Sequence, residues 1–127
     1  MNLIGENITY KPDDQFHLND VSFNFKKGNL YTILGRTLSG KTTFLKTIAG
    51  LLNPDSGNLS FEDNDFIKIP VWERNVAMVY QQFINYPHLN VYENIIFPLK
   101  QRKISEDQIK KDVEEALKTV GLVGFVK

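Results

Sequence analysis

Residues 35–42 have the types and the spacing of a phosphate-binding loop. They read Gly-Arg-Thr-Leu-Ser-Gly-Lys-Thr and fit the pattern G-x-x-x-x-G-K-[ST] at every fixed position. In such a loop, consecutive backbone N–H groups curl around a phosphate, and the glycines allow the backbone to approach it closely. Lys41 would add positive charge at the β- and γ-phosphates, and the hydroxyl of Thr42 would ligate Mg²⁺. The pattern therefore predicts a nucleotide site.

The segments on either side of the loop are those that such a site requires. Residues 30–34 form a short apolar run that predicts a buried strand, and residues 43–52 carry apolar side chains at helical spacing. A helix that begins here would direct the positive end of its dipole toward the bound anion. The order of strand, loop and helix favours a nucleotide site over the alternative, an ordinary glycine-containing turn between two core elements.

The composition is that of a small globular chain without an overall charge bias. Of the 127 residues, 42% are hydrophobic and 12% aromatic, which is enough to form a core. Fifteen basic and fifteen acidic residues cancel, so the net charge does not favour nucleic acid as a partner. Because the chain contains no cysteine, disulfides and cysteine-based zinc sites are excluded. Neither a signal peptide nor a long apolar stretch is recognisable, so we expect a soluble, cytoplasmic chain.

The remaining pattern predicts a mixture of strands and helices. Strands are predicted at residues 3–10, 18–25, 30–34, 59–61, 66–69 and 76–80, with the pair at 59–61 and 66–69 forming a hairpin. A short helix is predicted from residue 91 to 99, ended by Pro98. A last helix is predicted to begin after Ser105 as N-cap, with Gln108 completing a capping box, and to stop at Gly121. Its apolar positions, at helical spacing, are Ile109, Val113, Ala116, Leu117 and Val120.

Three segments, taken together with the loop, resemble the ATP-binding cassette (ABC) family. Residues 47–57 resemble the stretch in which the helix after the loop ends in Gly-Leu and a Pro-x-Ser-Gly turn leads into a β-hairpin. Residues 74–82 resemble the strand that ends in the family's Q-loop glutamine, and residues 86–94 resemble the opening of its helical subdomain. These motifs span nearly the whole chain in the family's order and spacing. The family resemblance is therefore more specific than the phosphate loop alone.

Two segments are most similar to the ATPases of bacterial carbohydrate importers, including the maltose and glycerol-phosphate type. One is the run Tyr-Pro-His-Leu at residues 86–89 with the surroundings of Gln81. The other is the unusual Thr-Leu-Ser at residues 37–39, inside the phosphate loop. The resemblance thus predicts a carbohydrate importer.

The resemblance implies a role for individual residues. The nucleotide would be bound by Gly35, Arg36, Thr37, Leu38, Ser39, Gly40, Lys41, Thr42 and Thr43. Lys41 and Gln81 would be catalytic, and Thr42 and Gln81 would hold Mg²⁺. Gln81 is preferred over its neighbour Gln82, which would be a solvated loop residue. Contacts to the coupling helix of a membrane subunit would come from Phe83, Tyr86, Pro87 and His88. The alternative for that loop is packing on its own domain.

One position departs from the family's pattern. The aromatic ring that usually stacks on adenine would fall near Pro12, which cannot stack in the same way. Tyr10 or Phe16 would substitute, although each fits a strand core residue equally well.

The resemblance also implies that parts of the catalytic machinery follow residue 127. The signature stretch, the Walker B strand ending in Asp-Glu, the D-loop and the switch histidine would all lie there, and residues 59–63, the nearest imitation of a Walker B strand, belong to the predicted hairpin. Hydrolysis requires a carboxylate that positions or activates water. We therefore expect an N-terminal fragment that binds MgATP without turning it over. An unpaired sheet edge would make it marginally stable alone.

The expected fold is α/β. It comprises a partial P-loop NTPase-like core with the phosphate-loop strand and helix, an antiparallel β subdomain within about residues 1–90, and the start of a helical subdomain at residues 91–127. The parent protein would lie at the cytoplasmic face of the membrane with permease subunits, a second ATPase subunit and, indirectly, an extracytoplasmic solute-binding protein. No nucleic-acid partner is expected. Two alternatives stay open, namely a non-catalytic nucleotide-binding module and an ABC protein outside transport.

Overall fold

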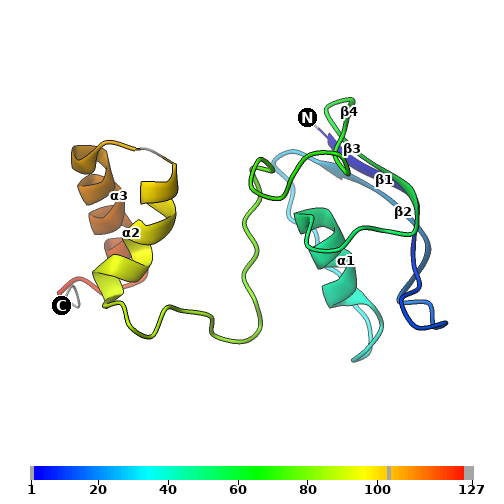
Figure 1. Ribbon diagram of the computed structural model, residues 1–127, viewed down its shortest axis with the longest axis horizontal. Helices are drawn as coiled ribbons and strands as arrows, with labels where there is room; N and C mark the ends of the chain where they lie inside the picture. Colours follow the sequence, from blue (N-terminus) through cyan, green and yellow to red (C-terminus); the bar gives the residue numbers. More distant parts are fainter. Residues whose placement is uncertain (1, 103, 125–127) are drawn as a thin grey trace. The chain divides into compact units, whose positions relative to one another are not determined.

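The computed structural model describes residues 2–102 and 104–124. The chain forms two compact units, Met1–Val79 and Tyr80–Lys127, and each is described by itself. The first contains a sheet and one helix, and the second contains two helices (Figure 1).

The first unit contains an antiparallel sheet with the strand order β2-β1-β3-β4. Its strands are β1 (Asn2–Tyr10), β2 (Leu18–Lys26), β3 (Ser56–Phe61) and β4 (Asn64–Asp65). The register pairs Gly5 of β1 with Phe23 on one side and with Leu59 on the other. A Cβ on Gly5 would lie 2.2 Å from the Phe23 ring, so the absence of a side chain at Gly5 lets this ring pack over the neighbouring strand.

The core of this unit lies between the sheet and helix α1 (Lys41–Ala49) (Figure 1). Its buried members are Ile8, Leu18, Phe44, Leu59 and Phe66. Phe44 is the contribution of the helix, and its ring meets that of Phe23 edge to face with centroids 4.9 Å apart. Helix and sheet are therefore joined by burial of apolar side chains, which holds the beginning of the helix in a fixed place.

Three predicted strands, at residues 30–34, 66–69 and 76–80, are not strands in the structure. Residues 30–34 and residues 76–80 form no ladder, and both are largely exposed, with Leu30 95% and Val79 96% accessible. An apolar run becomes a strand only when a neighbouring strand satisfies its backbone groups, and among the described residues no ladder includes either run. A hairpin does form here, but its second strand was predicted in the wrong place, because β4 is Asn64–Asp65 and residues 66–69 form bends.

The second unit contains helices α2 (Val91–Gln101) and α3 (Glu106–Thr119) (Figure 1). They share an apolar cluster made of Ile96, Ile109, Val113 and Leu117. Three of these positions were predicted from helical spacing, whereas Ala116 and Val120 are exposed, the latter to 65%. As predicted, α3 ends just before Gly121, whose φ of 71° suits glycine.

The start and end signals of these helices differ from two predictions. Pro98 lies inside α2 rather than ending it. The predicted capping box at Ser105 does not form, and the side-chain amide of Gln108 donates to Asp112, at 2.6 Å. A capping box occurs at α2, where Asn90 accepts from the N–H of Glu93 and the carboxylate of Glu93 accepts from the N–H of Asn90.

Candidate nucleotide site

The phosphate loop joins the extended segment 30–34 to α1. Gly40 is the N-cap of α1 with a φ of 85°, and its carbonyl accepts the first helical hydrogen bond from Phe44 at 2.8 Å. The helix therefore begins directly at the last loop residue. Among the described residues, no side chain caps this end. The N–H groups of the first turn are thus available to an acceptor such as a phosphate oxygen.

Lys41 holds the loop closed around its ammonium group. Its Nζ donates to the carbonyl oxygen of Gly35 at 2.8 Å, to the carbonyl oxygen of Arg36 and to the hydroxyl of Ser39 at 3.3 Å. These contacts draw the two ends of the loop together. The result is a ring of backbone with a positive charge inside it, which is the electrostatic arrangement that an anion requires.

Two glycines of the loop lie close to neighbouring atoms. A Cβ on Gly35 would lie 2.4 Å from the Ser39 hydroxyl oxygen. A Cβ on Gly40 would lie 2.1 Å from the carbonyl oxygen of His17, and the positive φ of Gly40 is one that other residues rarely adopt. At Gly40 a side chain would clash with backbone, whereas at Gly35 it would clash only with the rotatable Ser39 hydroxyl. The groups that fit a phosphate are the Lys41 ammonium and the uncapped N–H groups at the start of α1.

The remaining predicted nucleotide ligands line the same loop. Thr42 is exposed on the first turn of α1 and Thr43 is half-buried, with its carbonyl accepting from the Thr47 hydroxyl at 3.0 Å. Leu38 is 99% accessible and has a φ of 65°. The Thr42 hydroxyl is therefore exposed next to Lys41, where a metal ligand would be useful.

The segment between β1 and β2 lies against the loop. The short approach of the His17 carbonyl to Gly40 places this segment beside the phosphate loop. Phe16 precedes His17 and is 56% accessible, with the Lys11 ammonium 5.3 Å from its ring centre. Tyr10 is half-buried and packs against the core. Of the two predicted adenine-stacking residues, Phe16 is thus the one with an exposed ring.

An apolar cavity of about 400 Å³ adjoins the loop. Its walls come from β2, from the extended segment before the loop and from α1; they include Val21, Phe25, Ile33, Gly40 and Phe44. The lining is mostly apolar, and its polar members are Thr32, Ser39 and Lys41. Most of this cavity therefore suits an apolar group rather than a phosphate.

Gln81 and the predicted partner loop belong to the second unit. Gln81, Gln82, Phe83, Pro87 and His88 are exposed, and Phe83 is fully accessible. Gln81 lies in the second unit and the phosphate loop in the first. Its assignment over Gln82 therefore stays a prediction.

The loop at residues 83–88, the predicted permease contact, is held against α2 by Asn94, for which no role was predicted. The Asn94 side chain accepts from the N–H of Tyr86 at 2.8 Å and donates to the carbonyl oxygens of Tyr86, Leu89 and Asn90. The Tyr86 ring packs on Phe97, with centroids 4.6 Å apart. Tyr86 thus contacts α2 through Asn94 and Phe97, whereas the Phe83 side chain is fully exposed. An asparagine four residues after a helix N-cap carries no sequence signal for such a role.

Comparison with known proteins places these features in context. The family described as ABC transporter matches residues 18–127. The spermidine/putrescine import ATP-binding protein PotA of Acetivibrio thermocellus is 43% identical over 120 residues, which is 94% of this chain and 34% of that protein. The proteins of the same name from Mycoplasma capricolum subsp. capricolum and Mycoplasma mycoides subsp. mycoides are each 40% identical over 119 residues, with the same coverage. The chain thus spans about a third of the length of these relatives.

The comparisons bear on the predicted solute class. The relatives are named for polyamine import, so they support an importer but not the predicted carbohydrate type. In the described residues, no helix has the length and apolar character needed to cross a membrane.

Proposed function

This chain belongs to the ABC transporter family, and on that premise we propose that it is the MgATP-binding part of an importer ATPase. Members of the family share a P-loop NTPase fold and bind ATP with Mg²⁺. The observation that carries the proposal is the phosphate loop, in which Lys41 lies inside a closed ring of backbone at the free start of α1. When bound, ATP would supply the phosphoryl group and Mg²⁺ would offset its charge.

Each residue of the loop has a separate task in this proposal. The N–H groups of residues 40–43 would donate to phosphate oxygens, Lys41 would contact the terminal phosphates, and Thr42 would hold Mg²⁺. Phe16 would stack on the base, since its exposed ring immediately precedes His17, whose carbonyl lies against Gly40. Gln81 would act on the metal and the attacking water, as the family resemblance implies.

Isothermal titration of the chain with MgATP tests the proposal. We expect binding by the wild type and at least about a tenfold loss of affinity in Lys41→Met, since a charge-assisted contact to phosphate is removed. Lys46→Met is the matched control, because Lys46 lies in the last turn of the same helix, away from the loop. No binding by the wild type, or equal losses in both variants, would contradict the proposal. Phosphate release is measured on the same sample, because the sequence predicts binding without turnover.

We propose that the solute of the parent importer is a polyamine rather than a sugar. The support is that relatives 40% and 43% identical to this chain are named for spermidine and putrescine import. Permease subunits would contact the exposed loop around Phe83, and a second ATPase subunit would complete the site. Disruption of the gene in its host should lower uptake of labelled spermidine or putrescine and leave uptake of labelled maltose unchanged. Loss of maltose uptake alone would favour the carbohydrate type, and loss of neither would favour a role outside transport.

A further inference from the structure

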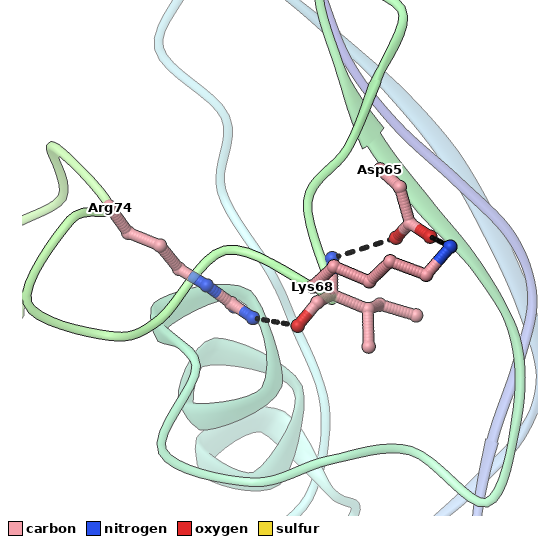
Figure 2. Close-up of polar contacts among 4 residues, drawn as sticks. Asp65, Lys68 and Arg74 are labelled. Atoms are coloured by element: carbon pink, nitrogen blue, oxygen red, sulfur yellow. Dashed lines mark hydrogen bonds and ion pairs between the residues drawn. The ribbon is translucent and has the colours of Figure 1, made fainter.

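Arg74 is a buried cation whose partners are backbone carbonyls rather than carboxylates. Its side chain is 7% accessible. Nε donates to the carbonyl of Ile69 at 2.8 Å, and Nη2 donates to that of Ile67 at 3.1 Å. Nη1 donates to the carbonyls of Thr47 at 3.3 Å and Ile48 at 3.1 Å. One planar fork thus binds two separate stretches of backbone, the last turn of α1 and the segment after β4. Figure 2 shows its contact with the segment after β4.

The electrostatics of this contact suit its place. Burial lowers the pKa of Arg74 from its ordinary value, but a guanidinium remains charged at any pH at which proteins fold. The last carbonyls of a helix carry partial negative charge, so a cation is favourable there. The ring of Phe66 lies 4.8 Å from the guanidinium carbon and adds a cation–π contact.

The sequence makes room for the guanidinium with a glycine. Gly50 is the C-cap of α1 with a φ of 80°, and a Cβ there would lie 2.7 Å from the guanidinium carbon of Arg74. The N–H groups of Gly50 and Leu51 close the helix end on the carbonyls of Thr47 and Lys46, at 3.1 and 2.9 Å. Arg74 therefore donates to a helix end whose backbone is already fixed by its own hydrogen bonds.

The second stretch of backbone is fixed as well. Asp65 accepts from the N–H of Ile67 at 3.1 Å and forms an ion pair with Lys68 at 2.8 Å (Figure 2). These contacts shape the turn that presents the carbonyl of Ile67 to Arg74. If the end of α1 moved relative to residues 67–69, the hydrogen bonds from Arg74 to one of them would lengthen, because the planar guanidinium is rigid.

We propose that Arg74 is a positioning residue that couples the phosphate-loop helix to residues 67–69, in the stretch between β4 and Gln81. It lies seven residues before Gln81 and binds the carboxyl end of the helix whose amino end forms the loop. A change at the loop would move α1 as a rigid rod, and Arg74 would transmit that movement to residues 67–69. The coupling to nucleotide rests on the proposed function, whereas the connection between the two stretches does not.

Hydrogen exchange of the full 127-residue chain, with and without MgADP, tests the proposal. In the wild type we expect MgADP to slow exchange in α1 and also at residues 67–69. In Arg74→Met we expect exchange without nucleotide to be about tenfold faster at Gly50 and Leu51, since hydrogen bonds from a charged donor are lost. We also expect the response of residues 67–69 to MgADP to disappear, which a purely structural role would not cause.

Two further variants keep the test decisive. Arg102→Met is the matched control, because Arg102 is an exposed arginine of the second unit, and it should behave as the wild type. Arg74→Lys keeps the charge without the fork and should retain the fold while losing most of the response at residues 67–69. A response that persists in both Arg74 variants would overturn the coupling. If the wild type binds no MgADP, the proposed function fails, and the connection is judged by exchange at Gly50 and Leu51 alone.

Discussion

Gly40 is a residue of the predicted nucleotide site at which any side chain would be disfavoured. Its φ of 85° and the 2.1 Å approach of a Cβ to the His17 carbonyl are two separate reasons for glycine. Gly28 has a similar φ of 82°, but a Cβ there would meet nothing within 4 Å. A substitution at Gly28 thus measures the cost of the left-handed backbone alone, whereas one at Gly40 measures that cost together with the steric clash against His17.

We expect Gly28→Ala to lower the free energy of unfolding by about 1 kcal/mol, the cost of a left-handed conformation. Gly40→Ala should lower it by about 1–3 kcal/mol more, because the backbone carbonyl of His17 must also move. Urea unfolding measures both variants. Equal losses would show that the segment at His17 does not restrain the loop.

Asp65 and Lys68 predict a dependence on pH with a definite sign. The side-chain hydrogen bond from Lys68 holds the pKa of the Asp65 carboxyl below its ordinary value. Stability from this pair is therefore present above the unfolded-state pKa of Asp65 and lost as the pH falls through the folded-state value. Asp65 likewise raises the pKa of Lys68, so the pair is also lost at high pH.

A carboxyl titration by NMR checks this contact. In Lys68→Met we expect the pKa of Asp65 to rise toward the ordinary aspartate value, because the partner is removed. Lys27→Met, which changes a lysine in the turn after β2, should leave it unchanged. An Asp65 pKa that is the same in the wild type and in Lys68→Met would contradict the ion pair.

The starts of the two helices of the second unit differ in how they are capped. Asn90 and Glu93 form a reciprocal capping box at α2, whereas the Ser105 hydroxyl makes no cap hydrogen bond at α3. We expect Asn90→Ala to cost about 1 kcal/mol of unfolding free energy and Ser105→Ala to cost much less. Thermal unfolding followed by circular dichroism measures both. A larger loss in Ser105→Ala would mean that its hydroxyl caps the helix in solution.

Most elements, but not all, were predictable from the sequence. The alternating pattern in β2 and the spacing of Ile109, Val113 and Leu117 report which side of an element is buried, and the structure agrees. Residues 30–34 and 76–80 show the limit of such patterns, because apolar character indicates burial without supplying the neighbouring strand. Helix capping shows another limit. The residues at the starts of α2 and α3 both fit the capping-box pattern, but the reciprocal hydrogen bonds form only between Asn90 and Glu93.

The candidate site was predictable to a similar degree. The loop pattern fixes Gly40 and Lys41, since backbone chemistry demands those types at that spacing. Arg74 could not be identified, because a buried arginine that binds carbonyls has no local pattern. The solute class was not predictable either. The residues used for it lie in the phosphate loop and in the loop at residues 83–89, which are expected to face nucleotide and permease rather than solute.

At the scale of the whole molecule, the two units have separate apolar cores. The first is centred on Ile8 and Leu59, and the second on Val113, which is 1% accessible. Because the two clusters share no member, we expect each unit to open with its own free energy.

Substitutions in each core test this independence. Val113→Ala should cost about 2 kcal/mol and speed hydrogen exchange in α2 and α3 while leaving β1 and β3 unchanged. Ile8→Ala is the reciprocal variant and should speed exchange in the first unit only. If either substitution speeds exchange throughout the chain, the units unfold together.

The loop carbonyls that accept hydrogen bonds from Lys41 compete with a bound anion for the same ammonium group. An arriving anion gains only the difference between its contact with the ammonium group and the contacts that the carbonyls of Gly35 and Arg36 already supply. The bonds from the ammonium group to the carbonyls are already charge-assisted on the donor side, and a phosphate adds attraction between opposite full charges, which grows with the charge of the anion. A singly charged anion gains much less by the exchange. The loop therefore selects its ligand by charge before any contact with a base or a metal is made.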